Sequence, residues 1–193
     1  MATRPFSTDD DSVEGVLPAD RAQAGDRTNR HQLNVVGSRM ADVVASAGGW
    51  LCDRARAGWD VNVLVADHDD SRPLSILGAT TLDLDAEFAS IMSKASRGGA
   101  LAVGADLLAA NTRVREDVLR LLKRGLTDVI VWGDEWPAEL GRKVDPVQHQ
   151  MSCAARAFKA HALAAAAVST EAFTTSETLF RIGTGSFRPL YSV

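Results

Sequence analysis

Cysteine is scarce in this sequence, with 2 residues among 193. Cys52 and Cys153 each lie in a helix-like, largely apolar stretch, which is typical of the free thiols of cytosolic proteins. The N-terminus lacks the basic start and continuous apolar core of a secretion signal, and no run approaches the roughly 20 apolar residues of a membrane helix. We therefore expect a cytoplasmic protein with no disulfide and no membrane partner.

Known catalytic and cofactor motifs are also missing. The sequence has neither of the phosphate-binding patterns GxxxxGK[ST] and GxGxxG, no CxxC or HExxH zinc pattern and no GxSxG nucleophile. His149 and Cys153 are one helical turn apart but are too few ligands for zinc, so a helical histidine and a packed cysteine are expected. We therefore predict no cofactor.

A surplus of basic residues is absent as well. The 21 Lys and Arg face 25 Asp and Glu, for a formal net charge of −4. Nucleic acid binding needs clustered basic side chains, so nucleic acid is an unsupported partner. Arg113, Arg120 and Arg124 do align on one face of a predicted helix. That face could bind an anionic partner surface, but a solvated helix face explains it more simply.

What the sequence does have is enough apolar material for one core, with 46% hydrophobic residues. Residues 1–31 combine Asp, Arg, Thr, Gly and Pro with few large apolar side chains, which predicts a disordered lead. We expect a single domain over residues 32–168. Residues 169–193 would be a tail or an edge hairpin.

The first half of the domain predicts a helix followed by two strands. Apolar residues at helical spacing from Leu33 to about Gly58 predict the helix, with a kink or a close contact with another backbone at the Gly48-Gly49 pair. The β-branched runs 61–66 and 74–81 predict the strands. About seven residues join them, too few for a parallel crossover, so we expect an antiparallel hairpin.

The second half predicts alternating helices and strands. Asp83 or Asp85 begins a helix to about residue 97, and residues 100–105 form a strand unless the helix continues to 110. A helix capped by Asn111 and ended by Gly125 leads into strand 128–132, giving a parallel β-α-β unit. Asp145-Pro146 begins an Ala-rich helix to about residue 168.

These elements predict an α/β fold with a small mixed sheet, in the order α-β-β-α-β-α-β-α, with an antiparallel first strand. Parallel strands would bring Asp106, Asp134 and Glu135 to one edge of the sheet, where α/β folds bind ligands. Carboxylates there could hold Mg²⁺. The cluster Asp67 to Asp70 would lie at the opposite edge, as turn residues.

Aromatic residues mark two further candidate sites. Trp132 and Trp136 flank the acidic turn and could wall a ligand pocket, although burial near the core rim explains them more simply. The C-terminal segment alternates large apolar and polar residues, typical of either an edge strand or a recognition peptide. Its candidate partner-binding residues are Phe180, Arg181, Phe187, Arg188 and Tyr191.

The sequence therefore favours a non-enzymatic interaction or regulatory module. A protein partner would bind the C-terminal segment or the small-residue face of the Ala-rich helix, which could also mediate homo-oligomer formation. The alternative is an enzyme of metal-assisted phosphoester or phosphoanhydride hydrolysis or transfer, with Asp106, Asp134 and Glu135 as ligands of Mg²⁺.

Overall fold

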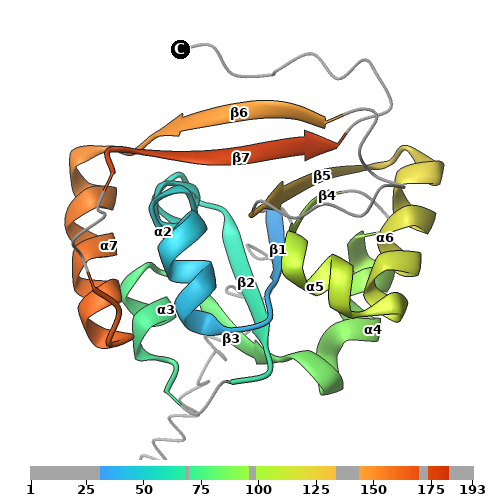
Figure 1. Cartoon of the computed structure of the whole chain (residues 1–193), viewed down its shortest axis with the longest axis horizontal. Helices are drawn as coiled ribbons and strands as arrows, with labels where there is room; N and C mark the ends of the chain where they lie inside the picture. The colour runs from blue at the N-terminus through green and yellow to red at the C-terminus, as the bar shows by residue number, and fades with distance from the viewer. Residues whose placement is uncertain (1–30, 68–69, 96–98, 134–143, 170–173, 183–193) are drawn as a thin grey trace, which may run out of the picture.

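The computed structural model describes residues 31–67, 70–95, 99–133, 144–169 and 174–182. They form a seven-stranded sheet in the order β3-β2-β1-β4-β5-β7-β6, with helices on both faces (Figure 1). The predicted α/β fold with a mixed sheet is confirmed. None of the helices in these ranges is long and apolar enough to cross a membrane.

Strands and helices alternate along most of the chain. The strands are β1 (Gln32–Val36), β2 (Asp60–Val65), β3 (Thr80–Asp83), β4 (Gly99–Gly104), β5 (Thr127–Trp132), β6 (Val144–Gln150) and β7 (Ser176–Ile182). The helices are α2 (Met40–Arg56), α3 (Arg72–Ile76), α4 (Leu84–Ala95), α5 (Ala105–Ala110), α6 (Thr112–Arg124) and α7 (Cys153–Ala165).

The first five strands are parallel to one another. Strand β7 is antiparallel to β5, and β6 is antiparallel to β7. Because β1 to β5 run the same way, their carboxyl ends meet at one edge of the sheet. That edge is where open α/β sheets bind ligands.

The core lies on both faces of the sheet. Helices α2, α3 and α7 cover one face, at the left of Figure 1, and α4, α5 and α6 cover the other, at the right. Neighbouring strand residues alternate between the two layers, so that Val35 packs under α2 while Val36 packs under α4 and α5. Burial on both faces explains why β2, β4 and β5 read as continuous apolar runs.

Helix α6 forms where its capping residues predict it. The Asn111 side chain accepts a hydrogen bond from the Val114 amide at 3.1 Å, and Gly125 ends the helix in the left-handed conformation at φ 66°. Asp83 caps α4 in the same way, accepting from the Ala86 amide at 2.6 Å. The predicted strand at 100–105 is also confirmed, and its parallel pairing with β5 completes the predicted β-α-β unit.

The prediction of a helix from Leu33 is wrong over its first residues. Gln32–Val36 is strand β1, at the centre of the sheet, and the helix begins at Met40. The buried apolar residues Leu33, Val35 and Val36 suit a central parallel strand as well as a helix, so periodicity could not separate the two. The element order α-β-β-α-β-α-β-α is therefore incorrect.

The predicted antiparallel hairpin of the first two strands is also wrong. Residues Arg72–Ile76 form the short helix α3, and β3 begins only at Thr80, parallel to β2. The connection is thus residues 66–79, which is long enough for a parallel crossover. Pro73 in the first turn of α3 fits this helix, because its missing N–H needs no intrahelical partner there.

The start of the last helix lies later than Asp145-Pro146. Residues Val144–Gln150 form strand β6, and α7 begins at Cys153 with Ser152 as its cap. Strand β6 is at the edge of the sheet, where a proline costs no ladder hydrogen bond if its nitrogen faces outward. Part of the predicted C-terminal tail is strand β7, which lies between β5 and β6 rather than at an edge.

The predicted disordered lead lies outside the described residues, apart from His31. The division of the chain into a lead, one domain and a C-terminal segment stays a prediction.

Candidate functional site

Three central strands end in a glycine at the carboxyl edge of the sheet. Gly37 follows β1, Gly104 ends β4 and Gly133 follows β5. The Trp132 ring lies over the first two: a Cβ atom on Gly37 or Gly104 would stand 3.6 or 3.5 Å from its Cζ2. Because these glycines have no side chains, the buried Trp132 ring can pack directly against the strand ends at this edge.

Asp106 and Ser38 meet above this floor. The Ser38 hydroxyl donates a hydrogen bond of 2.5 Å to Oδ2 of Asp106, joining the ends of β1 and β4. A Cβ atom on Gly104 would come within 2.5 Å of Oδ1 of Asp106, which no real contact allows. Glycine at position 104 is therefore what lets Asp106 fold back over the strand end. The predicted place of Asp106 is correct.

Asp67 belongs to the same edge, contrary to the sequence-based prediction. Its Oδ1 accepts a hydrogen bond of 2.8 Å from the backbone N–H of Met40, the first residue of α2. Asp67 reaches this position because β2 runs parallel to β1, not antiparallel. Asp70, in the same cluster, accepts from the Arg72 amide at 2.9 Å and so makes the turn into α3, as turn residues do.

Arg39 supplies the positive charge among these acids. Its guanidinium forms a two-bond ion pair with Asp42, with Nε 2.9 Å from Oδ2 and Nη2 3.0 Å from Oδ1. The pKa of Arg39 is raised above its usual value, first by the hydrogen bond and charge of Asp42 and further by the charges of Asp67 and Asp106. The arginine side chain is 69% exposed, so it can reach a ligand from solvent.

A hollow of about 290 Å³ lies beside this group. Met40, Ala41, Asp67 and Asp70 line one side, and Pro73 with the alanines 165–167 at the end of α7 line the other. The hollow is wide enough for a small substrate group and combines apolar walls with two carboxylates. Such a combination is common in ligand sites.

Within the described ranges, no group of three or more His, Cys, Asp and Glu side chains is placed to hold a metal ion. Arg39 offsets one of the three negative charges that Asp42, Asp67 and Asp106 bring to this edge. Asp134, Glu135 and Trp136 lie outside the described residues. Trp132 does not wall an open pocket: it is 4% exposed and belongs to the core.

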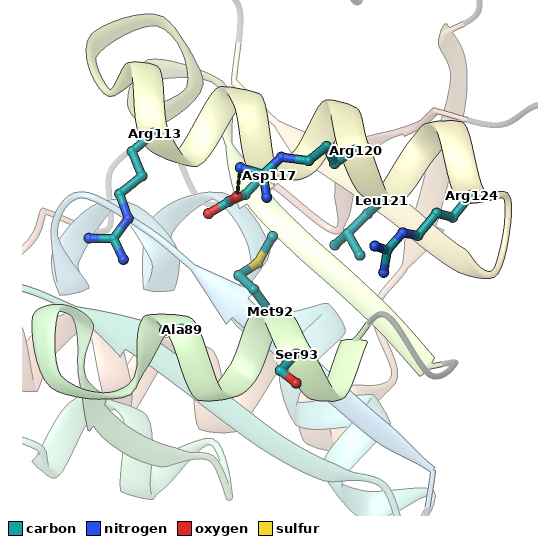
Figure 2. Close-up of a pocket in the computed structure, with 8 residues that line it drawn as sticks. All are labelled: Ala89, Met92, Ser93, Arg113, Asp117, Arg120, Leu121 and Arg124. Carbon is teal, nitrogen blue, oxygen red and sulfur yellow. Dashed lines mark ion pairs between the residues drawn. The ribbon is translucent and has the colours of Figure 1, made fainter.

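The basic face predicted on α6 is real and borders a groove. Figure 2 shows Arg113, Arg120 and Arg124 projecting from α6 over α4, with Asp117 between them. The groove measures about 340 Å³. It faces away from α2, on the opposite side of the sheet from the hollow described above.

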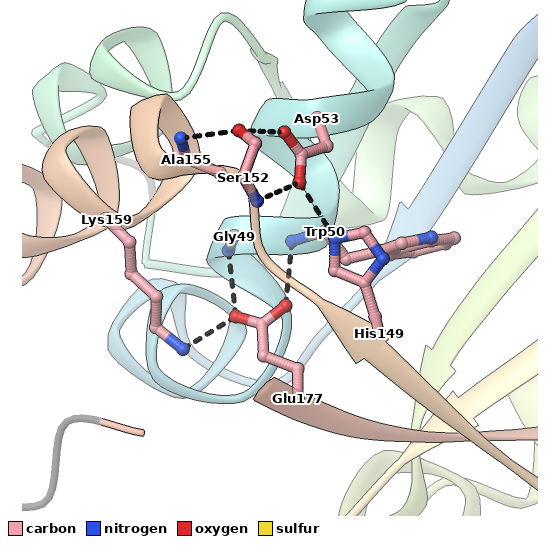
Figure 3. A network of polar contacts seen from close by, with 8 residues as sticks. All are labelled: Gly49, Trp50, Asp53, His149, Ser152, Ala155, Lys159 and Glu177. Atoms are coloured by element: carbon pink, nitrogen blue, oxygen red, sulfur yellow. Dashed lines mark hydrogen bonds and ion pairs between the residues drawn. The ribbon is translucent and has the colours of Figure 1, made fainter. Parts of the chain in front are cut away.

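A buried ion pair holds α2 in place (Figure 3). Glu177 of β7 accepts from the amides of Gly49 and Trp50 at 2.8 and 2.7 Å, and from Lys159 of α7 at 2.6 Å. The Lys159 ammonium also donates to the Ala45 carbonyl at 2.7 Å. The carbonyl of residue 45 and the amide of residue 49 are hydrogen-bond partners in a regular α-helix, so the ion pair contacts the acceptor and the donor of the same backbone pair. The Gly48-Gly49 pair does make a close contact, but with side chains rather than with another backbone as predicted: a Cβ atom on Gly49 would stand 2.0 Å from Sδ of Met151.

A second polar network joins α2 to the start of α7. Asp53 accepts from the Ser152 hydroxyl at 2.6 Å and from the Ser152 amide at 3.1 Å, and it lies 2.9 Å from Nε2 of His149. Burial alone would raise the pKa of Asp53, but these hydrogen bonds outweigh burial and lower it.

This second network is not a nucleophile with its base. The Ser152 hydroxyl donates to Asp53 and accepts from the Ala155 amide at 3.0 Å, so it is a helix cap. The histidine bonds the carboxylate, not the hydroxyl. The prediction of a helical His149 and a packed Cys153 is wrong, since His149 lies in β6 and Cys153 is exposed at the start of α7.

Of the predicted partner-binding residues, two are described. Phe180 and Arg181 lie in β7, where Arg181 pairs with Asp128 of β5 at 3.5 Å. They therefore help to build the sheet rather than a separate recognition peptide. The remaining three, Phe187, Arg188 and Tyr191, lie outside the described residues.

Sequence reasoning missed Ser38 and Arg39. Both follow β1, which was assigned to a helix. A signal was present: an apolar pair, then glycine, then a polar residue within two positions occurs at Val35-Val36-Gly37, Ala102-Val103-Gly104 and Val131-Trp132-Gly133. Strand ends with this shared pattern would have placed all three at one edge.

Comparison with known proteins gives a fold but no family. No family model matches the chain. No curated protein matches it either. Among solved structures, A40926 pseudoaglycone deacetylase Dbv21 is 14% identical at a TM-score of 0.56, covering 82% of this chain and 100% of its own. A deacetylase–teicoplanin complex is 12% identical at a TM-score of 0.56, and the match covers 79% of this chain and 98% of the other. The zinc-inhibited form of teicoplanin deacetylase Orf2 is 11% identical at a TM-score of 0.51, and the match covers 78% of this chain and 97% of the other.

These neighbours overturn the predicted non-enzymatic interaction module. They are deacetylases, and this chain matches nearly their whole length. The alternative prediction of a hydrolase agrees with them better. At this level of identity the likeness establishes the fold alone.

Proposed function

We propose that this protein is a hydrolase that removes an acyl group from an amide nitrogen at the carboxyl edge of the sheet. The observation that carries the proposal is the coincidence of a deacetylase-like fold with a polar group of Ser38, Arg39, Asp67 and Asp106 at that edge. Substrate sites of such sheets lie at this edge.

Asp106 is the general base in this proposal. Ser38 engages Oδ2, which leaves Oδ1 to accept a proton from water. The water oxygen bonds to the acyl carbon, the carbon–nitrogen bond breaks, and the proton passes from Asp106 to the departing nitrogen. A carboxylate and an amine are released.

Arg39 stabilises the negative charge that develops on the acyl oxygen. Asp42 orients its guanidinium, and the three surrounding acids keep the pKa of Arg39 raised, so it stays charged throughout the working pH range. Asp67 is a positioning residue: by accepting from the Met40 amide it holds the start of α2, and therefore Arg39, against β2.

The test is release of acetate from a panel of N-acyl amides, including teicoplanin, followed by NMR with the full chain. Asp106→Asn should lower the rate by about 10²–10⁴-fold, the usual contribution of a general base. Asp145→Asn, on the edge strand β6, is the matched control and should not change it. No hydrolysis of any amide, or equal rates for the two variants, would refute the proposal.

Metal dependence is tested in the same assay. The mechanism above predicts that EDTA leaves the rate unchanged. Activity that appears only with Mg²⁺ or Zn²⁺ would instead favour a metal site in which Asp106 is joined by Asp134 and Glu135.

We also propose a cytoplasmic location. The thiols of Cys52 and Cys153 are both free, as in proteins of a reducing compartment. Fractionation of the native cell tests this.

A further inference from the structure

The groove between α4 and α6 is not used by the proposed hydrolase. Its floor is partly apolar, formed by Met92 and Leu121, and its rim carries three guanidinium groups (Figure 2). Arg113 lies over the Phe88 ring, with Cζ 5.8 Å from the ring centre. Arg120 is paired with Asp117 and is 66% exposed. Three positive charges against one negative charge leave the groove basic in a chain whose net charge is −4.

We infer that this groove binds the chain's own acidic segment, residues 9–14, in cis. The segment reads Asp-Asp-Asp-Ser-Val-Glu and carries four acids and no base. It complements the groove in charge, and its Val13 side chain suits the partly apolar floor.

The two elements match in length. Arg113 and Arg124 are eleven residues apart on a helix, which is about 16 Å at 1.5 Å per residue. Asp9 and Glu14 are five residues apart, which is also about 16 Å for an extended chain at roughly 3.3 Å per residue. An extended segment can therefore place a carboxylate at each end of the row of arginines.

The segment can also reach the groove. Strand β1 starts at Gln32, next to the start of β4, where a Cβ atom on Gly99 would stand 3.5 Å from the Gln32 carbonyl oxygen. Helices α4 and α6 end just before β4 and β5, so their C-terminal ends lie at this same amino edge. The seventeen residues from Glu14 to His31 span at most about 60 Å, which exceeds the length of α6 several times.

Cysteine cross-linking in the full chain tests the inference. Cys153→Ser removes the exposed thiol, while Cys52 stays buried. Ser12→Cys then places a thiol in the acidic segment, and Ala89→Cys places one on the exposed side of α4 in the groove. The matched control replaces Ala89→Cys with Ala157→Cys, which is exposed on α7 at the opposite face of the sheet.

Under mild oxidation we expect a bridge within one chain between positions 12 and 89, read by mass spectrometry. Its rate should exceed that of the 12–157 control by about tenfold, which corresponds to ~1.4 kcal/mol. The triple replacement R113Q/R120Q/R124Q should abolish this difference, as should 1 M NaCl, where the screening length is about 3 Å. Exposed arginines contribute little to stability, and circular dichroism checks that the variant is folded.

Charge reversal provides the second measurement. R113E/R120E/R124E should remove the preference for position 89, and adding D9K/D10K/D11K/E14K should restore it. Equal bridging to positions 89 and 157, bridging that the arginines do not affect, or bridges only between two chains would each overturn the inference.

Discussion

The buried pair of Lys159 and Glu177 allows a quantitative prediction. Their side chains are 6% and 2% exposed, and they bind α2 at the Gly49 amide and at the Ala45 carbonyl one turn earlier. We consider Lys159→Met, Glu177→Met and the double variant. Each single change leaves one charge buried without its counter-charge.

The expected cost of each single change is about 3–5 kcal/mol of unfolding free energy, because a lone buried charge keeps its desolvation penalty. The double variant removes both charges, and the Gly49 amide and the Ala45 carbonyl can still be paired within α2, because residues four apart are hydrogen-bond partners in a regular α-helix. It should therefore be no less stable than either single variant. The implied coupling between the two sites is at least the cost of one single change, about 3–5 kcal/mol.

Urea unfolding at neutral pH, followed by tryptophan fluorescence, to which the buried Trp50 and Trp132 contribute, measures these differences. With a slope of roughly 2 kcal/mol/M, a loss of about 4 kcal/mol lowers the midpoint by about 2 M. A double variant whose loss equals the sum of the single losses would refute the reasoning, since it would mean that neither residue depends on the other.

Three further outcomes follow from the structure. The pKa of Asp53 is lowered in the folded state, so its contribution to stability is full above its unfolded value of about 3.9 and is lost as the pH falls through the folded value. Acid should therefore lower the unfolding free energy of the parent protein more than that of Asp53→Asn, and the two values should converge at low pH. Parallel profiles of unfolding free energy against pH would contradict this. Gly104→Ala should displace the Asp106 carboxylate and lower the rate of hydrolysis, while the melting temperature changes by only a few degrees because the added Cβ meets an exposed side chain. An unchanged rate would contradict the role of Asp106 as the general base. Cys153 should react quickly with a thiol reagent and Cys52 only after unfolding, because burial raises the pKa of Cys52. Rapid reaction of both thiols in the folded protein would show that Cys52 is not buried.

The carboxyl edge shows how local errors change a functional prediction. The acidic residues Asp67 and Asp106 were assigned to opposite edges because residues 74–81 looked like a second strand. Residues 72–76 instead form α3, so the connection is long enough for β2 to run parallel to β3 and to β1, the reverse of the direction predicted for β2. The site then contains Asp67, Asp106, Ser38 and Arg39 together.

The sequence by itself determined the elements that depend on neighbouring residues. Helix α6 has its cap, its C-terminal glycine and its apolar face within 15 residues of one another. The runs of β2 and β5 are rich in β-branched residues and predict strands, whereas the run of β4 also fitted a continued helix. The class of fold follows from their alternation.

Only the tertiary structure decided the elements whose sequences fit two conformations. Leu33–Val36 is a strand because β2 and β4 flank it, and Val144–Gln150 is a strand because β7 pairs with it. Those partners lie far along the chain, so no local signal reports them. The direction of each strand, and therefore which acids share an edge, is set by the same long-range pairing.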